Sequence, residues 1–125
     1  MEFSIAEKNG LFEMKIWGVA NPHGYHEILS TLTTHGKWVP GSKLIWELSN
    51  IIVNDLTVLE IATIAAICEK YGDAIGKARI AKIVPDDLVY GLNRIWEYHV
   101  FERWEATSEL FRTREDAIEW LYKEE

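Results

Sequence analysis

Two stretches in which apolar and polar residues alternate open the chain, at residues 3–8 and 11–18. Alternation with a period of two is typical of a strand with one buried face. The dipeptide Asn9-Gly10 joins the two stretches, and it favours a tight hairpin because both turn positions need a positive φ. The pattern therefore predicts an antiparallel β-hairpin at the start of the domain.

Helical spacing and strand-like runs then alternate along the chain. Asn21-Pro22 begins a predicted helix that runs to about residue 35, since asparagine caps helices and proline suits the first turn. The other predicted elements are strands at 43–49, 78–84 and 107–111, and helices at 57–71, 85–101 and from residue 113 onward. This order, β-β-α-β-α-β-α-β-α, predicts an α/β fold with a five-stranded mixed sheet and four helices mainly on one face.

Charged residues stand near the middle of three predicted strands, as Lys15, Glu47 and Lys82. A parallel strand that is covered on both faces is usually almost uninterrupted apolar sequence. We therefore expect the three side chains to alternate in charge across one sheet face that water partly reaches. The alternative is that Glu47 is a buried acid with a partner elsewhere in the chain.

The composition is that of one globular domain over residues 1–125, with 48% hydrophobic and 26% charged residues. A net charge of −7 argues against a nucleic acid partner, because phosphate binding needs clustered lysine and arginine. The longest apolar stretch is too short to span a bilayer, and the first residues lack the pattern of a secretion signal. We expect a cytoplasmic protein, with peripheral contact with a membrane as the alternative.

The segment 44–59 contains Glu-Leu-Ser-Asn, an apolar triplet and Asp55, and it resembles the strand–loop–helix segment of STAS domains, the fold of the sporulation anti-anti-sigma factor. The segment 110–121 resembles the closing strand and helix of the SpoIIAA-like branch, also described as STAS/SEC14-like. The resemblance implies a single STAS-like domain over nearly the whole chain. It also implies a non-enzymatic regulatory or binding module, since apolar-ligand binding and membrane association are suggested for that branch.

In regulatory members of the family, the residue two positions after the motif aspartate is a phosphorylated serine. Placing Asp55 on that aspartate puts Thr57 at the phosphorylated position. A phosphate there would meet free backbone N–H groups at a helix start. Leu56 and Val58 replace the serine and glycine on either side of that position in the family. The alternative is that Thr57 only caps the helix.

The predicted helix at 85–101 carries more aromatic side chains than one buried stripe can hold. We predict that this helix binds a small apolar or lipid-like ligand, or docks on a membrane or a protein partner. The residues expected at this surface are Trp38, from the loop before the third strand, and Tyr90, Ile95, Trp96, Tyr98 and Phe101. The alternative is that these rings pack internally. A homodimer through a sheet face that carries Trp17, Ile45 and Ile80 is a further alternative.

Three residues could carry chemistry in an enzyme, namely His23 and His26 at a helix start and Cys68 on the apolar side of a helix. Two imidazoles do not complete a zinc site. A reactive thiolate needs an electropositive and partly exposed setting. We therefore expect no metal, no cofactor and no enzymatic activity.

Overall fold

The computed structural model describes residues 1–53, 56–84, 86–87, 90–91, 94 and 104–123. Its elements are β1 (Glu2–Lys8), β2 (Leu11–Val19), α1 (Pro22–Thr33), β3 (Lys43–Ile52), α2 (Val58–Lys70), α3 (Gly72–Ile75), β4 (Arg79–Ile83), β5 (Thr107–Phe111) and α5 (Arg114–Leu121). The predicted strands are confirmed, as are the first, second and last of the predicted helices. The predicted helix at 85–101 lies mostly outside the described residues.

The opening hairpin forms as its turn sequence predicts. β1 pairs with β2 in antiparallel orientation, and both turn residues have a positive φ, 54° at Asn9 and 84° at Gly10. The Gly10 N–H donates a 2.9 Å hydrogen bond to the Glu7 carboxylate. Because this bond favours the charged form, it holds the pKa of the Glu7 carboxyl below its ordinary value.

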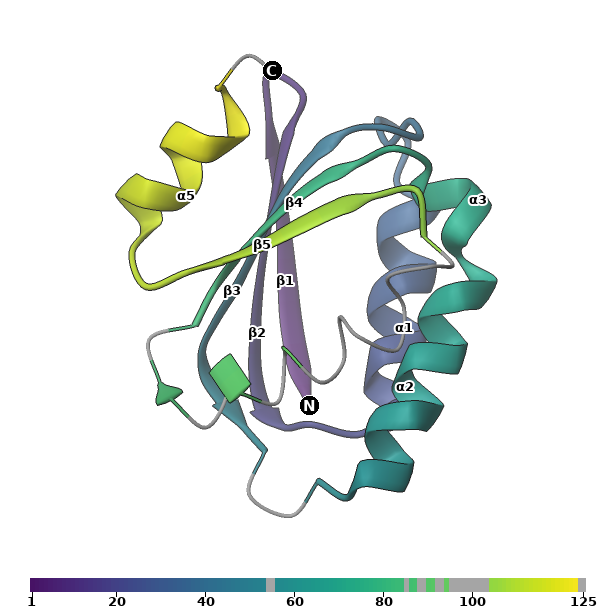
Figure 1. The fold of residues 1–125 in the computed structure, drawn as a ribbon. Coiled ribbons are helices and arrows are strands. Elements are labelled where there is room, and N and C mark those ends of the chain that lie inside the picture. Colours follow the sequence, from purple (N-terminus) through teal and green to yellow (C-terminus); the bar gives the residue numbers. More distant parts are fainter. Residues whose placement is uncertain (54–55, 85, 88–89, 92–93, 95–103, 124–125) are drawn as a thin grey trace.

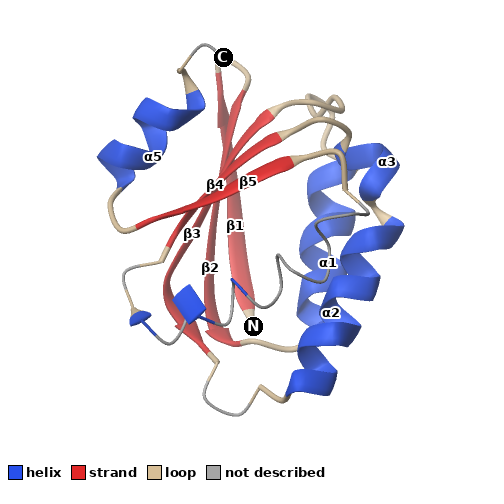
Figure 2. Cartoon of the chain, viewed as in Figure 1, coloured by secondary structure: helices blue, strands red, loops and turns tan. Residues whose placement is uncertain are grey.

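The sheet is mixed and has the strand order β1-β2-β3-β4-β5. Every neighbouring pair after the hairpin is parallel. The helices α1, α2 and the one-turn α3 cover one face, whereas α5 lies against the other face (Figures 1 and 2). Among the helices that the structure describes, α5 is the one on the other face, so these helices lie mainly on one face.

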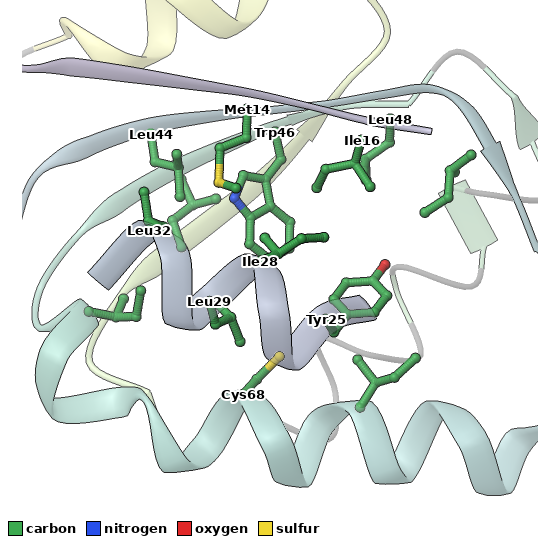
Figure 3. Packing of buried hydrophobic residues seen from close by; sticks show 14 of the residues in the cluster. Met14, Ile16, Tyr25, Ile28, Leu29, Leu32, Leu44, Trp46, Leu48 and Cys68 are labelled. Atoms are coloured by element: carbon green, nitrogen blue, oxygen red, sulfur yellow. The ribbon is translucent and has the colours of Figure 1, made fainter. Parts of the chain in front are cut away.

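The main core fills the space between the sheet and the helices α1 and α2 (Figure 3). The buried side chains labelled there are Met14, Ile16, Leu44, Trp46 and Leu48 from the strands, Tyr25, Ile28, Leu29 and Leu32 from α1, and Cys68 from α2. Burial disfavours the charged form of a phenol, so it raises the pKa of Tyr25. A smaller apolar cluster beneath α5 is formed by Ile45, Ala81, Ile83, Ala117 and Leu121.

The separation of the buried residues into two clusters, one on each face of the sheet, corrects the expected dimer face. Ile80 belongs to the main core and Ile45 to the cluster beneath α5, and both are fully buried. Among the three residues named for that face, only Trp17 is exposed. Ile45 and Ile80 therefore offer no surface to a second copy of the chain.

The strand register also corrects the predicted row of charges. Lys15 stands opposite Glu47, as expected, but the next partner of Glu47 is Ile83. Lys82 stands opposite Trp46, on the other face, where its side chain is fully buried and its Nζ lies 5.6 Å from the indole centroid. Glu47 is half-buried. The prediction of a partly wet face thus holds for Lys15 and Glu47 and was wrong for Lys82.

Candidate functional site

Four exposed apolar side chains lie at the end of the molecule where the parallel strands end. Val19 and Ile52 are opposite each other at the carboxyl ends of β2 and β3, and Val58 and Leu59 form the first turn of α2 at the same end of the molecule (Figure 1). We call these four residues the carboxyl-end surface. Seven large hydrophobic side chains are exposed among the described residues, and four of them lie here.

The sequence pattern did not reveal this surface. Helical spacing in the predicted helix at 57–71 puts Leu59 on the same apolar side as Ile61 and Cys68 and so predicts that it is buried, but the side chain is exposed. The buried positions of α2 begin only at Ile61. The signal that the sequence offered for this surface was the apolar pair Val58 and Leu59 directly after the cap residue Thr57. The first turn of a helix can extend past the elements that cover the rest of the helix.

Thr57 lies beside this surface, as the N-cap of α2, and is exposed. Its hydroxyl accepts a 3.1 Å hydrogen bond from the Glu60 N–H and donates one of 3.0 Å to the Glu60 carboxylate. That carboxylate also accepts from the Thr57 N–H, which completes a capping box. The hydroxyl is thus both a structural cap and accessible from solvent. Asp55 lies outside the described residues.

Replacing Thr57 by alanine is expected to lower the free energy of unfolding by about 1 kcal/mol, because the capping box loses its hydroxyl. Thr57→Ser should retain most of the stability. Thr63 also belongs to α2, but its hydroxyl only donates to the Leu59 carbonyl within the helix. Thr63→Ala should therefore be close to neutral, and urea denaturation of all three variants checks the order. Equal losses for the two alanine variants would contradict a capping role.

The described part of the predicted aromatic surface is a stack of charged and aromatic groups. The Tyr90 ring has the Arg112 guanidinium 4.6 Å from its centroid and the Arg94 guanidinium at 5.3 Å. Arg94 also donates a 3.0 Å hydrogen bond to the Tyr90 hydroxyl. The other residues named for this surface, Ile95, Trp96, Tyr98 and Phe101, lie outside the described residues. Ligand binding there stays a prediction.

Trp38 is a packing residue in this structure. It is buried, stacks edge-on against Phe12 with ring centroids 5.1 Å apart, and donates a 2.8 Å hydrogen bond to the Ala74 carbonyl. Phe12 lies near the start of β2, whereas Tyr90 contacts Arg112, just after the end of the parallel strand β5. The structure therefore does not bring Trp38 and Tyr90 together.

The residues considered for catalysis have ordinary partners. His23 pairs with Glu27 at 2.9 Å, and the His26 imidazole lies 3.0 Å from the Tyr71 hydroxyl. Cys68 is fully buried. No group of three or more metal-ligating side chains occurs among the described residues.

The strand order, the register and the placement of the described helices are those of an α/β domain with a STAS/SpoIIAA-like fold. An uncharacterised protein of Shewanella loihica with a SpoIIAA-like fold superposes with a TM-score of 0.61 at 17% identity, covering 96% of this chain and 92% of that one. An anti-sigma factor antagonist from Mycobacterium paratuberculosis superposes with a TM-score of 0.58 at 14% identity, covering 98% and 94%. These likenesses confirm the fold expected from segments 44–59 and 110–121.

The sequence itself has no comparable match. No family model matches the chain, and no curated protein matches it in sequence. Among the described residues, no helix is both long and apolar enough to cross a membrane. What the chain shares with the two solved structures is the fold.

Proposed function

We propose that the chain is a non-enzymatic binding module that docks on a protein partner through its carboxyl-end surface, and that phosphorylation of Thr57 weakens the docking. The observation that carries this proposal is the exposure of Val19, Ile52, Val58 and Leu59 at one end of the molecule, next to an exposed hydroxyl. Grouped exposed apolar residues are typical of interaction sites. The likeness of the fold to an anti-sigma factor antagonist supports a protein as the partner.

A phosphate on Thr57 would act on this surface in two ways. It would add roughly two negative charges next to apolar side chains that must lose water on docking. The phosphate would also be strongly hydrated. It would also repel the Glu60 carboxylate, which now contacts the Thr57 hydroxyl at 3.0 Å. The capping box would open while the phosphate took its place at the positive end of α2. The first turn of α2 would thus change in both charge and shape.

Val58→Asp is expected to weaken partner binding by about tenfold or more, because an interface core tolerates an unpaired charge poorly. An acidic residue in the first turn of a helix is favourable, so the variant should fold. Val39→Asp is the matched control: Val39 is similarly exposed, 61% against 69% for Val58, but lies in the loop before β3 at the other end of the strands. Affinity capture identifies the partner, and interferometry with the purified partner gives both dissociation constants.

The switch is tested with chain that carries phosphothreonine at position 57. This phosphorylated form should bind the partner more weakly than the unmodified chain. The Thr57→Ala variant should bind as tightly as the unmodified chain. Equal affinity of the modified and unmodified chains would refute the switch, and equal losses for Val39→Asp and Val58→Asp would refute the surface. A lipid-like molecule recovered with the protein in place of a protein partner would instead support the prediction for residues 85–101.

A further inference from the structure

An open concavity of about 730 Å³ lies on the sheet face opposite the main core, since its strand residues alternate with those that the core buries. Its lining comes from the strands β1 to β4, from the turn between β5 and α5, and from the first residue of α5. The lining residues are Ser4, Ala6, Glu13, Lys15, Glu47, Ser49, Ile83, Arg112, Thr113 and Arg114. The eight-residue α5 covers only part of this face, and the small side chains on β1 do not fill the remainder. The hollow therefore follows from the short closing helix.

The position of α5 beside the hollow is fixed by contacts with β4. The Arg79 guanidinium lies 4.3 Å from the Trp120 ring centroid and donates a 2.5 Å hydrogen bond to the Trp120 carbonyl. Ala117 and Leu121 are buried against the sheet. These contacts hold α5 against the sheet on one side of the concavity.

The residues that line the concavity carry one more positive than negative charge. Three cations and two carboxylates line it, in a chain whose net charge is −7. Arg114 pairs with Glu13, and one oxygen of Glu47 accepts a 2.9 Å hydrogen bond from the Ser49 N–H. Within the part of the chain that the structure describes, the Lys15 ammonium makes no hydrogen bond or ion pair, although it stands opposite Glu47 in the register. Lys15 is therefore available to an anion.

Further donors surround Lys15. Arg112 pairs at 2.8 Å with Asp87, whose side chain is 94% exposed, and its guanidinium lies 4.6 Å from the Tyr90 ring centroid. Exposed ion pairs are weak, so an anion in the hollow could compete with Asp87 for the guanidinium. The Thr113 hydroxyl accepts from the Asp116 N–H as the cap of α5, which leaves its own proton free to donate. Ser4 and Ser49 add two hydroxyl groups. Donors of this kind suit the oxygens of a carboxylate or a phosphate.

Glu47 restricts the kind of anion that fits. Its carboxylate lies half-buried in the same hollow and would repel a ligand that is anionic on every side. It would accept a hydrogen bond from a ligand hydroxyl instead. We propose that this concavity is a binding site for a small hydroxylated organic anion, with its acidic group at Lys15 and Arg112 and a hydroxyl at Glu47.

Two matched probes test the site. Glycerate and glycerol 3-phosphate carry the same hydroxyl pattern with a carboxylate or a phosphate, and glycerol is the uncharged control. In a titration followed by ¹⁵N–¹H spectra, either anion should shift the amide signals of Lys15, Ser49 and Thr113 in a saturable way at constant ionic strength. Glycerol should not, and the anion that binds more tightly identifies the acidic group.

Lys15→Gln and Arg112→Gln should each weaken binding by about tenfold, since each removes a charged hydrogen bond. Lys70→Gln, which removes an exposed charge at the end of α2, should leave binding unchanged. No saturable shift with either anion, or equal effects of Lys15→Gln and Lys70→Gln, would overturn the site. Val58→Asp should not affect it, because Val58 belongs to α2 on the other face of the sheet, so this proposal and the docking proposal fail separately.

Discussion

Replacing Trp46 by alanine is expected to lower the free energy of unfolding by about 3–5 kcal/mol, a large part of the roughly 5–15 kcal/mol that holds a domain folded. The side chain is 1% exposed and lies between the sheet and α1, with the Tyr25 ring centroid 6.3 Å away (Figure 3). Its removal leaves a cavity and takes the indole from beside the buried Lys82 ammonium. Guanidinium denaturation followed by circular dichroism measures the change.

Trp17→Ala is the matched control for this prediction. Trp17 belongs to the strand next to that of Trp46 but is 40% exposed. Its replacement removes the same group while leaving no closed cavity, so the loss should stay below about 1.5 kcal/mol. Equal losses for the two tryptophans would contradict the core described above.

Gly76→Ala is expected to cost about 2–5 kcal/mol, the sum of backbone strain and overpacking. Gly76 ends α3 with φ 62° and ψ −143°, a region that is essentially restricted to glycine. A Cβ atom there would lie 2.7 Å from the Pro40 Cβ atom. The loop before β3 would have to move, and with it the hydrogen bond from the Gly41 N–H to the Ile75 carbonyl.

Alanine variants at two other glycines distinguish the cost of backbone strain from the cost of steric contact with Pro40. Gly41 has φ 93°, but a Cβ atom at this position would meet no atom within 4 Å, so Gly41→Ala tests strain alone. Gly36 has neither a positive φ nor a close neighbour, and Gly36→Ala should be neutral or slightly stabilising. Denaturation midpoints should therefore fall in the order Gly36→Ala, Gly41→Ala, Gly76→Ala. A loss at Gly76 no larger than that at Gly41 would show that Pro40 moves away freely.

Local chemistry made much of the fold predictable. Asn9-Gly10 specified the hairpin, and Asn21-Pro22 specified the start of α1, where the Asn21 side chain accepts from the Gly24 N–H. Thr113 caps α5 in the same manner. Such signals involve residues within a few positions of each other, so they need no knowledge of the rest of the molecule.

The one-turn α3 was not predictable in the same way. The predicted end of the helix at 57–71 is confirmed, because α2 ends at Lys70 with Tyr71 as its C-cap, but a further turn, α3, begins at Gly72. The turn packs Ile75 into the main core. The burial of Ile75 depends on packing against distant elements, which the local sequence does not specify.

The candidate functional residues were likewise predictable from the sequence only in part. The sequence placed Thr57 at a helix start, and the capping box confirms that position. It did not predict that the first turn of α2 would be exposed, nor that Trp38 would pack on Phe12 and α3. Exposure depends on which other elements reach a residue, and spacing along one helix carries no such information.

The sequence by itself determined the kind and order of the described elements other than α3, because caps, turns and hydrophobic periods act over a few residues. Only the tertiary structure decided which sheet face each charge occupies. A shift of one residue in strand register moves a side chain to the other face, which is why Lys82 is buried beside Trp46 while Lys15 lines the open concavity. The size of that concavity likewise depends on where the short α5 packs on the sheet.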